Sequence, residues 1–282
     1  MKSYRNARIV MLLALGVICL NACQKMEQPP LGDYPKDANP PGGPLKFFAA
    51  MDEKNVDSIK ANYGTFNNAS IVAGGVSGMC AQFDGSQNGY INYPSANDFA
   101  STASDFTISF WINATLAQKD HVNADGVMAL ANTLNVDGGP NGFWGNFTIY
   151  ADHETSTSDS MLLKIALFRV DSLTSFDGAN WKWPKMYDGQ WHHVVYTYTA
   201  ADSLLTAYRD GAFFNKVTTG RQIKFGFASQ LILGGFQEAV GIVSDYPSNT
   251  WMSGFPGEMD NVRLYSEALS ADDIKSIYDN KQ

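Results

Sequence analysis

Glu258 and Asp260 have the spacing that acid–base cleavage of a glycosidic bond uses. One residue separates them, so on a β-strand both carboxylates lie on the same face. A hydrolase that retains configuration needs two carboxyl groups about 5 Å apart. The next position on that face is Val262, so the acidic series on this face ends with these two residues. The spacing alone therefore does not favour a hydrolase.

The remaining acidic and histidine residues form no catalytic or zinc-binding pattern. Two acidic pairs fall in polar segments, where solvated carboxylates are expected: Asp152 with Glu154, and Asp120 with Asp125. His192 and His193 are adjacent, so on a strand they face opposite sides and cannot share one metal ion. His121 and His153 are isolated. We expect His193 to occupy a polar position inside the fold.

Four tryptophans lie in segments rich in glycine, proline and asparagine, which predict loops: Trp144, Trp181, Trp183 and Trp251. Loops on a rigid scaffold commonly carry binding residues. An indole face beside asparagine and lysine side chains suits a neutral glycan, so we predict these four as ligand-binding residues. Alternatively, the loops fold back and bury the rings. Phe110, Trp111, Trp191, Tyr196 and Tyr208 lie in alternating segments and are expected to pack within the sheets.

Residues 1–22 have the features of a bacterial lipoprotein signal peptide. Lys2, Arg5 and Arg8 precede a short apolar run, and a small residue stands before Cys23. The run is too short to span a bilayer. The prediction is that Cys23 becomes the lipidated N-terminus; an ordinary secretory signal is the alternative.

Residues 23–44 are predicted to be an extended tether. They contain many prolines and glycines and few apolar side chains. The sequence after Cys23 resembles the surface-export signal of lipoproteins of the Bacteroidota. We therefore expect a protein anchored in the outer membrane by lipid alone and facing the cell exterior.

The charge and cysteine content narrow the choice of partners. The chain has 282 residues, 20 Lys and Arg against 28 Asp and Glu, and a net charge of −8. An acidic protein is a poor partner for nucleic acid. Cys80 is the only cysteine left after the predicted processing, and its apolar surroundings predict a buried thiol.

The folded region, residues 45–282, shows many short alternating segments and no long helical period. This pattern predicts an all-β sandwich of two sheets, a jelly roll, with a short C-terminal helix that begins at Ser270. Asp210-Gly211 predicts a hairpin turn. The predicted strands are 45–49, 79–83, 90–93, 106–113, 127–131, 146–151, 161–170, 191–198, 204–209, 213–217, 231–234 and 259–265.

Five motifs in order resemble the laminin-G-like domains of the concanavalin A-like lectin/glucanase superfamily: Gln-Phe-Asp-Gly at 82–85, Asp-Phe-Thr-Ile-Ser-Phe-Trp at 105–111, Asp-Gly-Gln-Trp-His-His-Val at 188–194, Leu-Ile-Leu-Gly-Gly at 231–235 and Gly-Glu-Met-Asp-Asn-Val-Arg-Leu-Tyr at 257–265. The resemblance covers the whole folded region and implies the same jelly roll. It says little about function, because this fold carries lectins, hydrolases and adhesion modules.

The resemblance also implies a structural Ca²⁺. In related domains the aspartate of the closing strand binds calcium with backbone carbonyls near an Asp-Gly turn, which here correspond to Asp260, Asp84 and Gly85. Oxygen ligands at about 2.3–2.6 Å are what a hard cation requires. The alternative is that Asp260 pairs with Arg263 or caps a turn.

Together these features predict a non-catalytic, lipid-anchored binding module that captures glycans as nutrients. The second hypothesis is an accessory protein-docking subunit beside a TonB-dependent importer and its partner lipoprotein. The third and least favoured is a glycoside hydrolase. A glycan binder needs an exposed aromatic platform, whereas a docking subunit needs an apolar patch of several hundred Å².

The lipid anchor can be tested with Cys23→Ala. This change removes the predicted lipidation site, so we expect the protein to leave the membrane fraction. Fractionation after a high-salt wash, followed by immunoblotting, measures the effect. A variant that still pellets with outer membranes contradicts the lipoprotein assignment.

Overall fold

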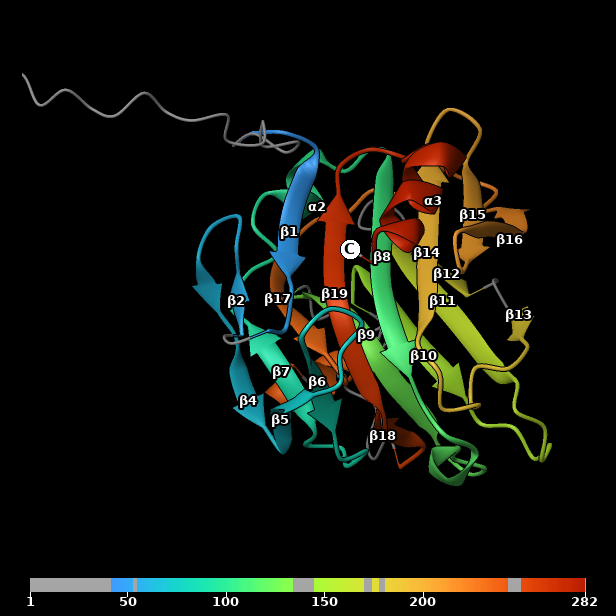
Figure 1. Ribbon diagram of the computed structural model, residues 1–282. Helices are drawn as coiled ribbons and strands as arrows, with labels where there is room; N and C mark the ends of the chain where they lie inside the picture. The colour runs from blue at the N-terminus through green and yellow to red at the C-terminus, as the bar shows by residue number, and fades with distance from the viewer. Residues whose placement is uncertain are drawn as a thin grey trace, which may run out of the picture. The chain divides into compact units, whose positions relative to one another are not determined.

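The computed structural model describes residues 42–52, 55–133, 145–169, 174–177, 181–242 and 250–281. These residues form two packed β-sheets with short helical segments (Figure 1). The predicted signal peptide and residues 23–41 of the predicted tether, with Cys23, lie outside the described residues. No helix among the described residues has the length and apolar character needed to cross a membrane.

Sheet A has the strand order β16-β15-β14-β8-β19-β1-β2-β3, and β6 joins it through β19 and carries β5. All its pairings are antiparallel. Its strands are β1 (Leu45–Ala49), β2 (Val56–Asp57), β3 (Asn62–Tyr63), β5 (Ala69–Ala73), β6 (Met79–Phe83), β8 (Phe106–Asn113), β14 (His192–Thr199), β15 (Leu204–Arg209), β16 (Ala212–Thr218) and β19 (Glu258–Tyr265).

Sheet B has the strand order β12-β11-β10-β9-β17-β7-β4, with β13 paired to β11 and β18 to β9. Only the β18–β9 pairing is parallel among those described. Its strands are β4 (Thr65–Asn67), β7 (Tyr90–Tyr93), β9 (Ala124–Asn132), β10 (Phe147–Asp152), β11 (Met161–Arg169), β12 (Thr174–Asp177), β13 (Trp181–Trp183), β17 (Ala228–Leu233) and β18 (Met252–Gly254). The short helices are α2 (Phe99–Thr102), η1 (Leu116–Gln118), η2 (Gln237–Val240) and α3 (Ala271–Asp279).

The predicted all-β sandwich with a C-terminal helix is confirmed. Strands β2, β3, β4 and β18 were not predicted, because two or three residues are too few to show an alternating pattern. The longer strands β5 and β12 were not predicted either. Segment 181–183 was predicted as a loop but pairs with β11 as a strand, because its aromatic residues find partners across the sheet.

Strand β8 shows how alternation builds the core. Phe106, Ile108, Phe110 and Ile112 face sheet B and belong to the main apolar cluster. Trp111, with Thr107 and Ser109, lies on the outer face, meaning the face directed away from the other sheet. Trp111 is nevertheless fully buried, because Tyr278 of α3 stacks on it with ring centroids 5.5 Å apart. The predicted division of β8 into two faces is confirmed.

Strand β19 departs from the predicted alternation. A regular strand would place Met259 on the face opposite to Val262 and Leu264, but all three lie in the main core. The register with β8 shifts between Asp260 and Arg263, and Asn261 has a φ of 51°. This β-bulge adds one residue and reverses the phase of the strand. The regular alternation expected from the sequence, which puts Val262 on the face of Asp260 and Met259 on the other face, is therefore wrong.

Helix α3 covers the outer face of sheet A. Ser270 and Asp273 form the predicted capping box: the Ser270 side chain accepts from Asp273 N, and Asp273 accepts from Ser270 N. Ile274 is fully buried. Gly211, with a φ of 74°, completes the predicted hairpin turn, and a Cβ there would come within 2.9 Å of Tyr278. The turn and the helix therefore constrain each other.

The two adjacent histidines face opposite sides, as predicted. Both ring nitrogens of His192 lie near carboxylates, 3.0 Å from Asp210 Oδ2 and 3.1 Å from Asp188 Oδ1. His193 lies 2.9 Å from Ser109 Oγ through Nε2. The register of β14 with β8 pairs His193 with Trp111, which puts His193 on the outer face of sheet A and not inside the sandwich as expected. Helix α3 covers it there, with the Tyr278 ring 6.3 Å away. Burial there lowers the pKa of His193 to about 3.

Two buried groups have strongly raised pKa values. Cys80 is fully buried, as predicted, and burial raises its pKa to about 12. Asp125 was expected to be solvated but lies on β9, only 2 % exposed. Burial raises the pKa of Asp125 to about 8; the Ser253 hydroxyl, 3.0 Å from Oδ1, partly offsets this.

Asp125→Asn is expected to stabilise the protein at neutral pH. The unfolded chain loses this proton near pH 4 and the folded protein only near pH 8, so stability falls as the pH rises between those values. Removing the charge should raise the free energy of unfolding at pH 7 by about 1–3 kcal/mol, the range for a poorly satisfied buried group. Denaturant titrations at pH 5 and 7 measure this gain. Equal stability of both proteins at pH 7 contradicts the prediction, and the exposed Asp84→Asn serves as control.

Candidate functional site

The predicted ligand-binding tryptophans fall into different environments. Trp144 lies outside the described residues. Trp183 is fully buried: its indole N–H donates to Leu163 O at 3.2 Å, and its ring stacks on Phe214 with centroids 4.3 Å apart. A buried indole presents no face to a ligand, so Trp183 is part of the core and its predicted binding role is wrong.

Trp181 is partly exposed at the edge of the core. It pairs with Leu163 across β13 and β11, and its ring meets Phe214 edge-on at 6.3 Å. It packs against the core from the inner side of sheet B, with Trp183 as its neighbour on the same face. This is the position of a residue that closes the open edge of the sandwich.

Trp251 is the tryptophan whose surroundings most resemble a binding platform. It is partly exposed and packs against a small apolar cluster on the outer face of sheet B. Its ring meets Phe236 edge-on at 5.9 Å, and Phe236 lies 6.0 Å from Tyr150. We call Tyr150, Phe236 and Trp251 the outer aromatic cluster; Tyr150 and Phe236 are buried, and Trp251 is the member that keeps part of its surface exposed. The backbone N–H of Ala124 donates to Trp251 O at 2.7 Å, which ties the tryptophan to β9.

Charged side chains border the outer aromatic cluster. Lys164 is the cross-strand partner of Tyr150, and its ammonium lies 5.9 Å from the centre of the Tyr150 ring. The same ammonium donates to Asp152 Oδ2 at 2.6 Å. Both side chains keep part of their surface exposed, 16 % for Lys164 and 20 % for Asp152. Hydrogen-bonding groups are therefore held beside the aromatic surface.

Sequence analysis missed Tyr150 and Lys164 because their proximity depends on strand register. The predicted strand 146–151 already placed Tyr150 on the face opposite to Ile149. No local signal showed that β11 would place Lys164 opposite Tyr150, or that the chain near residue 251 would return to β9. Trp181 and Trp251 do not come together, since β10 and β11 lie between them and they face opposite sides of sheet B.

Asp260 is a buried carboxylate with one unpaired oxygen, as expected of a calcium ligand. It is fully buried, its Oδ2 accepts from Val76 N at 2.7 Å and from Ser77 N at 3.3 Å, and its Oδ1 has no hydrogen-bond partner. Burial raises the pKa of Asp260 to about 7, partly offset by the backbone N–H groups of Ser77, Val76 and Asn261; the neighbouring carboxylate of Asp52 raises it further. A buried carboxylate oxygen without a partner fits a calcium ligand.

The other predicted calcium ligands lie elsewhere. The β19–β6 register pairs Glu258 with Gln82 and Met259 with Ala81. Asp260 therefore lies opposite Cys80 of β6. Asp84 comes four residues after Cys80, which is about 13 Å along the chain at the usual rise per residue of a strand. Asp84 Oδ1 instead accepts from Ser86 N at 2.9 Å. The structure does not bring Asp84 and Gly85 to Asp260.

Asp52 is the carboxylate that the structure places near Asp260. Its Oδ1 accepts from Met79 N at 3.1 Å, so both carboxylates hold the same loop, residues 74–79. No group of three or more His, Cys, Asp or Glu side chains suited to a metal is present in the described part of the chain. A calcium ion here would need backbone carbonyls to complete its shell, and it would neutralise two acids.

Asp260 does not pair with Arg263, the alternative that the sequence left open. The Arg263 guanidinium donates to Asn261 O at 3.3 Å and lies 4.0 Å from the centre of the Phe48 ring. The register of β19 puts both side chains on the outer face, but the Arg263 guanidinium lies over Phe48 of the neighbouring strand β1. Asp260 caps the loop at 76–77 instead.

The geometry defines a two-sheet antiparallel β-sandwich with a candidate binding surface on an outer face. Residues 84–275 match the family model of the concanavalin A-like lectin/glucanases superfamily, and the chain belongs to this family. No protein of curated function matches the sequence.

Solved structures with the same fold include toxin binding domains. The binding domain of Botulinum neurotoxin DC in complex with SialylT has 12% identity and a TM-score of 0.58, with 85% of this chain and 51% of that chain covered. The same domain in complex with rat synaptotagmin II has 11% identity and a TM-score of 0.57, covering 85% and 52%. The binding domain of Paraclostridial Mosquitocidal Protein 1 has 14% identity and a TM-score of 0.57, covering 84% and 52%.

This chain spans about half the length of those toxin domains. At such low identity the likeness shows the fold alone. The similar structures are binding domains, one crystallised with a glycan and one with a protein, while the superfamily also includes glucanases.

The calcium hypothesis can be tested by chelation of protein first shown to contain calcium. Removing a ligand that binds only the folded state lowers stability by about 2.7 kcal/mol at a hundredfold excess over its Kd. We expect EDTA to lower the melting temperature of the parent protein and of Asp84→Asn. Asp260→Asn should show no such sensitivity. Identical melting curves of the parent protein with and without EDTA rule out the calcium site.

Proposed function

We propose that this protein is a non-catalytic carbohydrate-binding module that holds a glycan at the outer aromatic cluster. The observation that carries the proposal is the partly exposed Trp251, which packs on Phe236 at one end of the outer aromatic cluster, while the Lys164–Asp152 pair lies at the Tyr150 end. An indole face covers the apolar face of a sugar ring, and the charged pair supplies a donor and an acceptor for its hydroxyls. Membership of a superfamily that contains lectins supports this function.

A catalytic role receives little support from the carboxylates. Asp260 is fully buried beneath the 74–79 loop, so it is inaccessible to a substrate next to Glu258. Both oxygens of Glu258 accept from amide side chains, those of Gln82 and Asn113. The two carboxylates on one strand face therefore do not form an accessible acid–base pair.

The protein-docking alternative is less well supported than glycan binding. The exposed large apolar side chains of the described residues lie on separate segments: Tyr63, Leu116, Val122, Phe213 and Phe227. A docking surface needs a contiguous apolar patch of several hundred Å². The complex of the toxin domain with synaptotagmin II shows that this fold can bind a protein.

The cellular context completes the proposal. A lipidated Cys23 and the tether at 23–44 would hold the module on the outer membrane of a bacterium of the Bacteroidota type, facing outward. There it would capture glycans for an importer of the TonB-dependent class. Its acidic charge is compatible with neutral glycans.

Trp251→Ala tests the binding surface. A glycan-array screen of the purified protein identifies the ligand, and calorimetric titration measures its affinity. We expect at least about tenfold weaker binding, equivalent to about 1.4 kcal/mol, with little change in melting temperature because Trp251 is only partly buried. Trp183→Ala is the structural control and should cost about 3–5 kcal/mol of stability. Unchanged affinity of Trp251→Ala for every glycan that the parent binds rejects this surface.

A further inference from the structure

A row of polar side chains crosses the outer face of sheet A. Ser70 on β5 pairs with Gln82 on β6, Gln82 pairs with Glu258 on β19, and Glu258 pairs with Asn113 on β8. The four residues occupy one level of four neighbouring strands, which lie side by side in Figure 1. We call them the polar row. Ser70 and Gln82 are exposed, and Glu258 and Asn113 are partly buried.

The groups of the polar row are held in fixed orientations. Asn113 donates through Nδ2 to Glu258 Oε2 at 3.0 Å, and Gln82 donates through Nε2 to Glu258 Oε1 at 3.4 Å. Each carboxylate oxygen therefore has one amide donor and can accept a further hydrogen bond. The amide oxygen of Gln82 and the hydroxyl of Ser70, both on exposed residues, add acceptors and a donor. This mixture suits a ligand whose hydroxyl groups both donate and accept.

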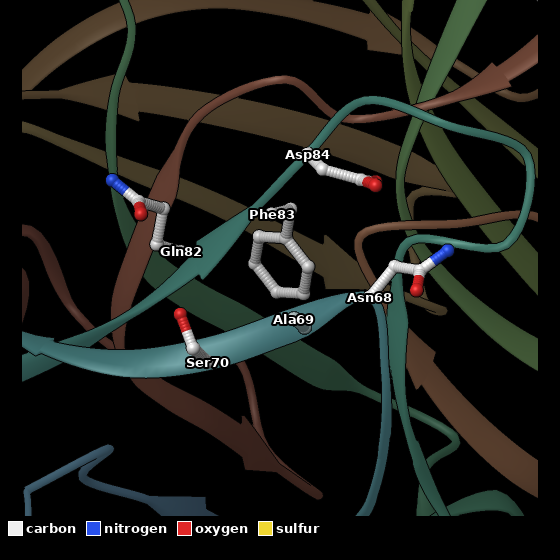
Figure 2. Close-up of a pocket in the computed structure, with 6 residues that line it drawn as sticks. All are labelled: Asn68, Ala69, Ser70, Gln82, Phe83 and Asp84. Carbon is white, nitrogen blue, oxygen red and sulfur yellow. The ribbon is translucent and has the colours of Figure 1, made fainter.

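A shallow pocket of about 330 Å³ lies at the β5–β6 end of the polar row. Figure 2 shows the residues that line it: Asn68, Ala69, Ser70, Gln82, Phe83 and Asp84. Ser70 and Gln82 thus belong both to the row and to the pocket. The Asp84 carboxylate is oriented by the N–H and hydroxyl of Ser86, at 2.9 and 2.8 Å. The row therefore ends in a hollow with its own hydrogen-bonding groups.

Trp191 lies at the opposite end of the polar row. The first pair of β14 is His192 with Ile112, so the preceding residue comes next to Asn113. Trp191 and His193 are two residues apart and therefore share a face of the strand, and His193 is on the outer face. Its indole N–H donates to Gly74 O at 2.9 Å, and the ring is partly exposed. The ring is therefore immobilised before any ligand binds, which lowers the entropic cost of binding.

The loop that holds Trp191 also borders the polar row. Gly74 begins the 74–78 connection between β5 and β6, whose Val76 N is fixed on Asp260 Oδ2 at 2.7 Å. Asp260 stands two residues from Glu258 on the same strand face. From Ser70 to Trp191 the surface extends for about 19 Å at the usual spacing of strands. This length accommodates a short oligosaccharide.

We propose that the polar row, with Trp191 and the pocket, is a second carbohydrate-binding site, specific for neutral oligosaccharides. Its set of side chains contains two carboxylates, Glu258 and Asp84, and no basic group. An anionic sugar would be repelled there. The expected ligand thus differs from the SialylT that is in complex with the toxin binding domain. It lies on the sheet opposite to the outer aromatic cluster and shares with the proposed function only the ligand class.

The test is calorimetric titration of the full protein with a neutral oligosaccharide from the array screen and with its sialylated form. We expect two binding sites per chain for the neutral sugar. Gln82→Ala, an exposed change, should weaken one site between about two- and tenfold, the range for one hydrogen bond. Trp191→Ala should remove that site, and Trp191→Phe should retain part of it. Glu258→Gln should improve binding of the sialylated form.

The outcomes separate the two sites. Loss of one site in Trp191→Ala and of the other in Trp251→Ala supports both. If Trp251→Ala alone abolishes all binding, while Gln82→Ala and Trp191→Phe bind like the parent, the second site is rejected. If the row variants abolish all binding and Trp251→Ala does not, the outer aromatic cluster is rejected instead. If the polar row of the parent protein binds neutral and sialylated sugars with equal affinity, the proposed selectivity for neutral oligosaccharides is wrong.

Discussion

The pairing of β19 with β8 in the middle of sheet A determines where the acidic side chains of this protein lie. The bulge at Asn261 lets Met259, Val262 and Leu264 all reach the core, although they are not in phase on a regular strand. Glu258 and Asp260, before the bulge, then remain on the outer face. Without the extra residue, either the core would lose an apolar side chain or a charged residue would enter it, and both changes are costly.

The same outer face carries several polar groups that the protein buries at a cost in solvation. His193 is held neutral beneath α3, and Asp260 lies beneath the 74–79 loop with one oxygen lacking a partner. Stacking of Tyr278 on Trp111 and the approach of Gly211 to that ring hold the helix in place. Burial by α3 and the loop covers His193 and Asp260, whereas Glu258 keeps part of its surface exposed. The covering elements therefore decide which polar residues remain accessible.

A sandwich offers two outer faces, and the side chains on them differ in this protein. The face of sheet B carries aromatic rings beside an ion pair, whereas the face of sheet A carries amides, hydroxyls and carboxylates in one level. The first arrangement favours stacking with orientation by charge, and the second favours multiple hydrogen bonds to hydroxyl groups. Two faces of this kind would allow one protein to hold a polymer at two points, which raises avidity without any new contact.

Alternation and turn chemistry in the sequence determined the sandwich, most of the long strands, the Ser270 cap and the two faces of β8, because these depend on neighbours within a few residues. The bulge at Asn261, the burial of Asp125 and Trp183, and the separation of Asp84 from Asp260 depend on strand register. Register also decided that Ser70, Gln82, Glu258 and Asn113 lie at one level although up to 188 positions separate them in the chain. Such pairings arise from the packing of the whole core, which no local segment specifies, and the tertiary structure alone therefore located the candidate binding surfaces.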